Sequence, residues 1–321
     1  MMNSLPVFVS AGEALSDMIR TGANTWKSKV GGAPWNVARI MASWGVPSGF
    51  AGAVSLDCFG EELAACSRSA GLDTRFLQQV DAPPLLAMVH KVHPPEYFFI
   101  GENSADLHFT PEALPSGWME CVRWVHMGGI SLARPPLSNK LLEMAHALKA
   151  SGVCISYDPN FRTVMDERYD FVFQEMTKLA DVIKVSDEDL HGLFRHHDAT
   201  AGLATLRTWN PEAMVLYTLG AKGAHLYTAQ AAAFMAPPSI EVIDTVGAGD
   251  VSIGGLLFSL QHHADRTLEE HLAFSVASGA AACLQAGANV PDMKVVERLF
   301  ASLIQESVEG PDNQGVRTRA S

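Results

Sequence analysis

The sequence predicts an α/β protein in which helices cover a doubly wound, mostly parallel β-sheet. Short apolar runs bounded by Gly, Pro and Asp have the length of buried strands, and amphipathic stretches with helical periodicity separate them. Glycine-rich motifs follow directly after several of these runs, where ligands bind in parallel sheets. The expected strands are 7–10, 48–52, 123–127, 153–157, 182–185 and 214–218, and the expected helices include 36–44, 137–150 and 171–180.

One region departs from this alternation. Leu85–Val92 and Tyr97–Ile100 alternate apolar and polar residues around Pro94-Pro95, which predicts a β-hairpin. Together with residues 13–29, the segment 85–110 is expected to form a small β-sheet lid; a surface hairpin without a role is the alternative. We expect residues 1–308 to form one domain and the polar residues 309–321 to be a disordered tail.

Composition narrows the class of protein. The chain has 321 residues, 48% of them hydrophobic and 18% charged, and a formal net charge of −12. This charge repels nucleic acid and anionic membranes, so neither is an expected partner. The five cysteines form no Cys-x-x-Cys pair, which is typical of free thiols in a reducing compartment. No basic leader or membrane-spanning run is seen, so a cytoplasmic protein is predicted.

The strongest functional signal is the run Asp-Thr-Val-Gly-Ala-Gly-Asp at 244–250. Gly247, Ala248 and Gly249 at the start of a helix let backbone N–H groups converge on an anion. A carboxylate at this place repels phosphate, so its presence needs a reason. Asp250 has one if it accepts the proton of an attacking hydroxyl. A glycine-rich turn capped by Asp is the alternative. The spacing matches neither a dinucleotide fingerprint nor a P-loop.

This run resembles the C-terminal signature of the PfkB, or ribokinase-like, carbohydrate kinases, and further motifs match in order from about residue 7 to 300. The resemblance implies a ribokinase-like three-layer α/β/α fold. It also implies phosphoryl transfer from ATP with Mg²⁺, and therefore ATP and a small sugar as the expected partners. A homodimer is left open.

Two N-terminal motifs resemble the family's sugar-binding elements. In Gly12–Asp17, Asp17 matches the carboxylate that grips sugar hydroxyls, and a carboxylate can accept two such hydrogen bonds. Gly31, Gly32 and Asn36 match the family's Gly-Gly-x-x-x-Asn motif, in which glycines allow close approach and the amide pairs with hydroxyls. A turn-stabilising Asp and a helix start are the alternatives.

The segment Asp158–Arg162 resembles fructokinases and ketodeoxygluconate kinases. Asn160 is expected at the sugar and Arg162 at the transferring phosphate, although a surface salt bridge would also explain the arginine. Asp106, in Ser-Ala-Asp, is a further expected sugar contact and favours the fructokinases.

The remaining motifs point to the nucleotide. Lys184, Thr218, Gly220, Gly223 and Asn289 are the expected contacts to ATP, together with Gly247 and Gly249. The small residues 277–282 are expected to leave room for adenine. Asp189 and Asp244 are the acidic candidates for Mg²⁺; Ser186 and Asp189 stand where the family carries Asn-x-x-Glu. The loop at Asn289 also resembles a monovalent-cation site, so a need for K⁺ stays open.

Within the family, we expect D-fructose to be the acceptor, at its primary 6-hydroxyl. The alternatives are 2-keto-3-deoxygluconate, ribose or a nucleoside. A non-catalytic sugar or nucleotide sensor is a rival of another class, but the base at Asp250 is present.

Overall fold

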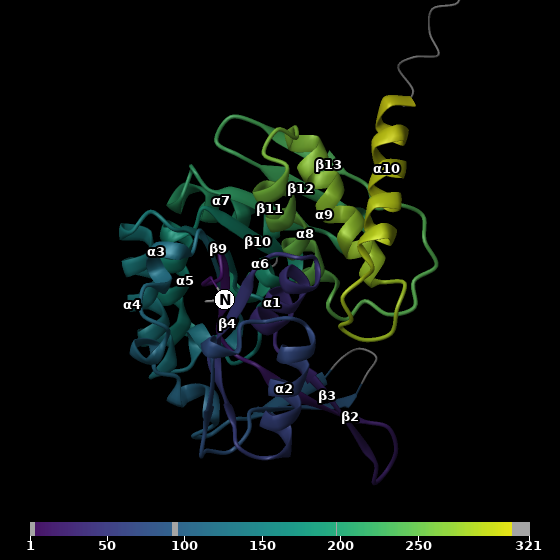
Figure 1. Ribbon diagram of the computed structural model, residues 1–321. Coiled ribbons are helices and arrows are strands. Elements are labelled where there is room, and N and C mark those ends of the chain that lie inside the picture. Colours follow the sequence, from purple (N-terminus) through teal and green to yellow (C-terminus); the bar gives the residue numbers. More distant parts are fainter. Residues whose placement is uncertain (1–3, 92–95, 197, 310–321) are drawn as a thin grey trace, which may run out of the picture. The chain divides into compact units, whose positions relative to one another are not determined.

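The computed structural model describes residues 4–91, 96–196 and 198–309. The chain divides into two compact units (Figure 1). The first runs to Thr218 and includes 227–231, and the second comprises 219–226 and the residues from Ala232 onward. The predicted tail lies outside the described residues except for its first residue, Glu309, where the last helix ends.

A parallel sheet forms the centre of the first unit. Its strands run in the order β11-β10-β9-β8-β1-β4-β5, and every pairing in that series is parallel. Successive strands leave β1 in opposite directions, which makes the sheet doubly wound, as predicted. The strands are β1 (Phe8–Ala11), β4 (Ser48–Ser55), β5 (Leu77–Val80), β8 (Trp124–Gly128), β9 (Cys154–Asp158), β10 (Val182–Ser186) and β11 (Met214–Thr218).

The helices of this unit largely begin and end where their sequences predict. The helix expected at 36–44 begins earlier, at Ala33, because Pro34 suits the first turn. The helix at 137–150 has the predicted bounds, and the one expected at 171–180 begins at Asp170. They are α1 (Ala33–Ser43), α2 (Cys58–Ser69), α3 (Trp118–Cys121), α4 (Leu137–Ala150), α5 (Asp170–Leu179), α6 (Asp187–Phe194) and α7 (Ala199–Trp209).

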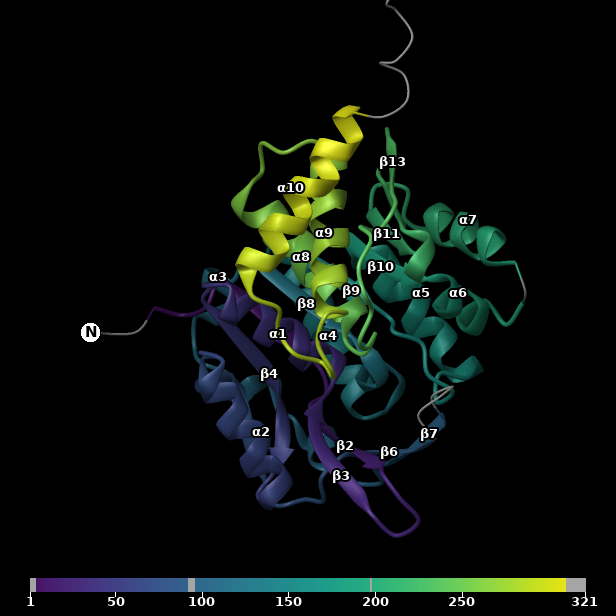
Figure 2. The same cartoon turned by 90° about the vertical axis from the view of Figure 1, so that its right-hand side faces the viewer.

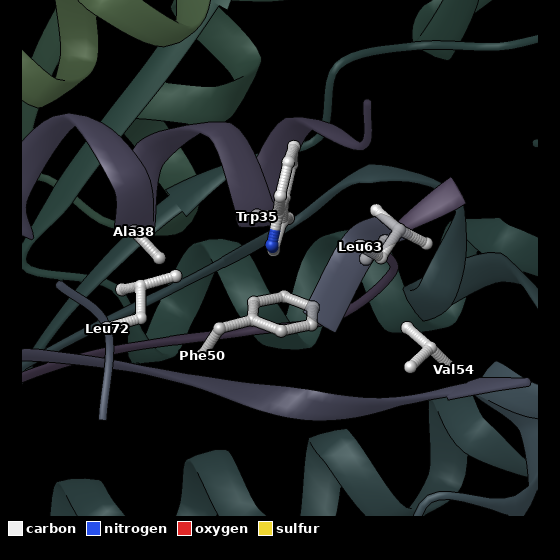
Figure 3. Close-up of a cluster of buried hydrophobic side chains, with 7 residues drawn as sticks. Trp35, Ala38, Phe50, Val54, Leu63 and Leu72 are labelled. Atoms are coloured by element: carbon white, nitrogen blue, oxygen red, sulfur yellow. The ribbon is translucent and has the colours of Figure 1, made fainter. Parts of the chain in front are cut away.

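Part of the apolar core joins helices α1 and α2 to strand β4. Trp35 of α1 is fully buried beside Phe50 of β4 and Leu63 of α2 (Figure 3). Its indole nitrogen donates to Ser67 Oγ over 2.9 Å, so the one polar atom of the ring is satisfied. This packing fixes α1, whose first turn carries Asn36.

A second, smaller sheet contains the predicted hairpin. Strands β2 (Leu15–Arg20), β3 (Trp26–Gly31), β6 (Leu86–Lys91) and β7 (Glu96–Ile100) lie in the order β3-β2-β6-β7. The β2–β3 and β6–β7 pairs are antiparallel and β2–β6 is parallel. Figure 2 shows these strands at one end of the first unit. The expected small sheet is therefore present, and Pro94-Pro95 lies outside the described residues.

In the second unit, helices α8 (Ala248–His262), α9 (Leu268–Ala282) and α10 (Met293–Glu309) lie side by side (Figure 2). Strands β12 (Ala224–Tyr227) and β13 (Ala232–Met235) precede them. A Cβ at Gly255 would lie 2.3 Å from Ser278 Oγ, and one at Gly279 would lie 2.2 Å from Ser252 Oγ. Ser278 and Gly279 therefore face α8, and the room for adenine beside residues 277–282 stays a prediction. Within the described chain, no helix has the length and apolarity to cross a bilayer.

Candidate active site

A buried charge cluster lies at the carboxyl end of the first unit's sheet. Lys184 Nζ of β10 lies 3.1 Å from Asp158 Oδ2 of β9 and 3.5 Å from Asp189 Oδ2 of α6. All three side chains are buried. Its ammonium compensates two buried carboxylates, which would be costly to leave unpaired. The contact of Lys184 to ATP stays a prediction.

Asp189 is an internal acceptor in the same cluster. Its Oδ2 accepts the Ser186 N–H at 2.8 Å, its Oδ1 accepts the Phe161 N–H at 2.8 Å, and Ser186 Oγ accepts the Asp189 N–H in return. Burial pushes the pKa of Asp189 upward, but Lys184 and these donors hold it below its usual value. Both oxygens therefore hold backbone N–H groups, and the Mg²⁺ role of Asp189 stays a prediction.

These carboxylates fix the loop that carries Arg162. Asp158 Oδ1 accepts the Asn160 N–H at 3.0 Å, and Asn160 has a left-handed φ of 47°. Arg162 Nη1 donates to Asn160 Oδ1 at 2.6 Å and to the Phe161 carbonyl at 2.7 Å. Within the described residues no carboxylate forms a salt bridge with Arg162, so the surface salt bridge considered from the sequence is absent there. The guanidinium is half-buried and suited to an external anion.

His126 is a buried neighbour that the sequence reasoning missed. Its Nδ1 lies 3.0 Å from Ser156 Oγ, its register partner on β9. Burial lowers the pKa of His126 to about 3, and Lys184 contributes to this shift. The imidazole is therefore neutral near pH 7. A histidine inside an otherwise apolar predicted strand was the available signal.

Asp17 lies on β2, in the small sheet, and Gly31 of β3 provides the space beside it. A Cβ at Gly31 would stand 2.5 Å from Asp17 Oδ2. A side chain at position 31 would therefore have to displace the Asp17 carboxylate, and glycine also allows the close approach of a ligand.

Gly32 and Asn36 begin helix α1. Gly32 is the N-cap with φ of 115°, and a Cβ there would lie 2.6 Å from the Glu13 carbonyl oxygen. The Gly32 carbonyl accepts the Asn36 N–H at 2.8 Å. The helix start considered as an alternative is thus real, and it places the Asn36 side chain in the first turn.

Glu13 is a second buried group without an expected role of its own. Its carboxylate accepts the N–H groups of Ile130 at 3.3 Å and Ser131 at 3.1 Å, and also the Ser131 hydroxyl. Burial raises its pKa although these donors oppose the shift. A Cβ at Gly129 would collide with Glu13 Oε1, so only glycine fits there. Glu13 thereby ties the chain after β1 to the turn after β8.

Asp106 lies in a different environment from the one predicted. Its Oδ2 pairs with Arg134 Nη1 at 2.5 Å, and its Oδ1 accepts from Ser104 Oγ at 2.5 Å. The side chain is 0% exposed. Burial raises its pKa, and Arg134 opposes this. Asp106 anchors Arg134 to the loop that follows β7, and its contact to a sugar stays a prediction.

In the second unit, the glycine-rich run forms the start of helix α8. Gly247 is the N-cap in the left-handed conformation with φ of 81°, and Ala248 and Gly249 open the first turn. A Cβ at Gly247 would lie 2.9 Å from Ala288 Cβ. Asp250 is the third helical residue and is only 8% exposed. The Ala248 N–H donates to the Thr245 carbonyl at 3.2 Å. The helix dipole and the other N–H groups at the start of α8 favour an anion.

Asp244 holds this turn to a second loop. Its Oδ1 accepts the Val246 N–H at 3.1 Å and its Oδ2 accepts the Gly287 N–H at 2.7 Å. Each oxygen thus accepts one backbone N–H group, and the Mg²⁺ role of Asp244 stays a prediction. Exposed Asn289 lies in the joined loop, with its Nδ2 donating to the Ala286 carbonyl at 2.9 Å.

The other residues expected to contact ATP are Gly223, Gly220 and Thr218, and the two glycines are needed for different reasons. Gly223 has φ of 101°, and a Cβ there would lie 2.3 Å from the Met235 carbonyl oxygen. Gly220 has φ of 56° and no atom within 4 Å of its Cβ position, so its requirement is conformational only. In the first unit, Thr218 Oγ1 lies 3.5 Å from the Val185 carbonyl at the end of β11.

A doubly wound sheet, a small accessory sheet and a glycine nest that contains one carboxylate define a phosphotransferase acting on a hydroxyl. The chain belongs to the pfkB family of carbohydrate kinases, because the model of that family matches residues 8–294. It is similar to a fructokinase from Vibrio alginolyticus, with 32% identity over 260 residues, 79% of this chain and 84% of that protein.

Solved structures agree with this assignment. A fructokinase from Xylella fastidiosa with bound ATP aligns with 95% of this chain and 100% of its own, at a TM-score of 0.83 and 28% identity. A fructokinase from Vibrio cholerae O395, in a form binding fructose, ADP and calcium ion, aligns with 92% and 98%, at a TM-score of 0.76 and 28% identity. The predicted family and ribokinase-like fold are confirmed.

Proposed function

We propose that this chain transfers the γ-phosphate of ATP to the primary 6-hydroxyl of D-fructose. The observation that carries the proposal is Asp250, a buried carboxylate in the first turn of a 15-residue helix whose N-cap and second residue are glycines. This combination suits a reaction that binds phosphate and also removes a proton.

The chemical step needs few groups. The Asp250 carboxylate accepts the hydroxyl proton as the new oxygen–phosphorus bond forms and the bond to ADP breaks. The backbone N–H groups of Gly247 and Gly249 stabilise the negative charge on the phosphate, and Arg162 adds a cation. The Ala248 N–H joins them when it leaves the Thr245 carbonyl. Asp17 and Asn36 bind the sugar hydroxyls. Gly31 and Gly32 have no side chain, so the backbone at these positions can approach the sugar closely.

The metal requirement follows from the donor set. Among the described residues there is no group of three or more His, Cys, Asp or Glu side chains that could hold a metal. We propose that Mg²⁺ arrives with ATP and takes its ligands mainly from phosphate and water. A need for K⁺ near Asn289 stays a prediction, which rates in KCl and in NaCl would test.

The organisation and location of the protein are further predictions. We propose that residues 1–308 act as one kinase domain in which the segments 13–29 and 85–110 form a lid that excludes water during transfer. The expected small-molecule partners are ATP and the sugar, and the expected location is the cytoplasm.

The direct test replaces the base. Asp250→Asn should fold and bind ATP but lose at least about 10²-fold in turnover, because a general base contributes that much. Asp265→Asn, an exposed acid just after the same helix, is the control and should retain activity. Near-normal turnover by folded Asp250→Asn would rule out this residue as the base.

The acceptor is tested with a panel. Catalytic efficiency measured by ADP formation should be highest for fructose against 2-keto-3-deoxygluconate, ribose and adenosine. A tenfold preference for another acceptor would change the substrate and leave the kinase assignment in place. ATP or sugar binding without turnover on any acceptor would instead favour the sensor.

A further inference from the structure

Tyr97 lies in strand β7 of the small sheet, on the same face as Asp17. Ile19 pairs with Val89 and Val89 with Tyr97, so Tyr97 shares a face with Ile19 and, two residues along β2, with Asp17. Phe98, the next residue, points to the opposite face and is 52% exposed, whereas Tyr97 is half-buried. Phe99, the third aromatic residue of the strand, lies on the face of Tyr97, with its ring centroid 5.7 Å from that of Tyr97.

The Tyr97 ring contacts the loop after β9. The Arg162 guanidinium carbon lies 5.7 Å from the ring centroid, within the range of a cation–π interaction. Burial raises the pKa of Tyr97; Arg162 opposes the shift and Asp17 adds to it, which puts both charges close to the phenol. The Tyr97 ring therefore connects the small sheet, which carries Asp17, to Arg162, the residue proposed to bind the phosphate.

The other contacts of Arg162 leave its orientation only partly fixed. Its hydrogen bonds within the described residues all leave from Nη1 and end on Asn160 and Phe161, in its own loop. A side chain bonded through one nitrogen can still pivot about that nitrogen. A ring packed against the guanidinium restricts this rotation, and it supplies no acceptor that would compete with phosphate.

We propose that Tyr97 is a positioning residue that holds Arg162 for the transferring phosphate and makes its orientation depend on the small sheet. The ring already packs against the guanidinium in the free protein. A sugar that orders the sheet would hold the ring there more firmly and restrict the rotation of Arg162 further. The inference rests on the proposed function, and it gives the enzyme a means of favouring transfer to sugar over transfer to water.

The first test separates the ring from the hydroxyl. Tyr97→Leu should lower kcat with fructose about tenfold and leave KM for ATP unchanged, because a cation–π contact is lost. Tyr97→Phe keeps the ring and should stay within about twofold. Phe98→Leu, on the opposite face of the strand, is the matched control and should retain full activity. Equal losses in Tyr97→Leu and Phe98→Leu would overturn the proposal.

The second test asks whether Tyr97 acts through Arg162. In an Arg162→Met background, adding Tyr97→Leu should cause no further loss of kcat, since contacting residues that share one function are not additive. Multiplied losses would show that the ring acts by another route.

A readout without turnover keeps this inference separate from the proposed function. In the free protein, Arg162→Met should speed amide hydrogen exchange at residues 96–100, while Asp265→Asn should not. Unchanged exchange would overturn the contact itself. If wild-type protein shows no sugar-dependent ADP formation, the proposed function fails instead, and the exchange result still decides the contact.

Discussion

The loop after β9 and the turn before α8 are both suited to an anion, but they are built by different means. In the first, Arg162 presents a full charge on a side chain, and buried Asp158, Lys184 and Asp189 fix its backbone. In the second, the positive potential comes from backbone N–H groups, and the Asp244 carboxylate fixes the turn. The stability of the loop after β9 should therefore depend on charge and pH. The stability of the turn before α8 should depend on backbone conformation.

Removing the central cation of the first region should have the largest effect. Lys184→Met leaves two buried carboxylates without compensation, which is expected to cost about 3–5 kcal/mol in the free energy of unfolding. Lys178→Met, which breaks an exposed ion pair with Glu175, is the control and should cost at most about 1 kcal/mol. Urea denaturation measures both. Similar small losses in the two variants would mean that the cluster around Lys184 is more hydrated than the structure indicates.

Acid should destabilise the first region through His126. The unfolded imidazole takes up a proton near its ordinary pKa of 6.5, whereas the folded one stays neutral down to about 3. Between these two pKa values the unfolded state binds more protons than the folded state. The free energy of unfolding therefore decreases as the pH is lowered, by about 2 kcal/mol from pH 7 to pH 5.

His126→Gln should remove this part of the pH dependence, and His191→Gln, at an exposed position, should not. Unfolding free energies measured at pH 7, 6 and 5 give the three slopes. An unchanged slope in His126→Gln would show that another group titrates. Asp189, whose folded pKa is lowered, acts in a lower window, losing its contribution only as the pH falls below about 4.

A backbone substitution should affect the second region more modestly. Gly247→Ala places a Cβ at φ of 81° and 2.9 Å from Ala288 Cβ. Gly71 has the same φ of 81° but no atom within 4 Å, so Gly71→Ala isolates the conformational cost of about 1 kcal/mol. Gly247→Ala should exceed it in thermal denaturation and should also weaken ATP binding. Equal losses would mean that Ala288 moves away at no cost.

The fold was largely predictable because its signals are local. Apolar runs such as Val182–Val185 and the alternation of Tyr97–Ile100 specify strands from neighbouring residues alone. The glycine-rich run before Asp250 likewise predicts the start of a helix and a backbone site for an anion. Pro34 moved the start of α1 only by a single turn.

Charge partners were not predictable, because they are distant in the sequence. Nothing near Asp106 indicates that Arg134 neutralises it, and nothing near Lys184 indicates that Asp158 lies across the sheet. The acidity of Asp189 and Asp244 suggested a cation, whereas their oxygens accept backbone N–H groups. A sequence shows where ionisable groups occur, but tertiary packing decides which of them remain available to a ligand.

The packing of α8 against α9 has a consequence for how these helices can vary. Gly255 faces Ser278, and Gly279 faces Ser252, so each helix carries one recess and one projection. Enlarging a glycine alone would collide with the serine opposite, and shrinking a serine alone would leave a gap. The two positions of each pair are therefore expected to change together among functional variants. Such paired changes would keep the distance between α8 and α9 constant.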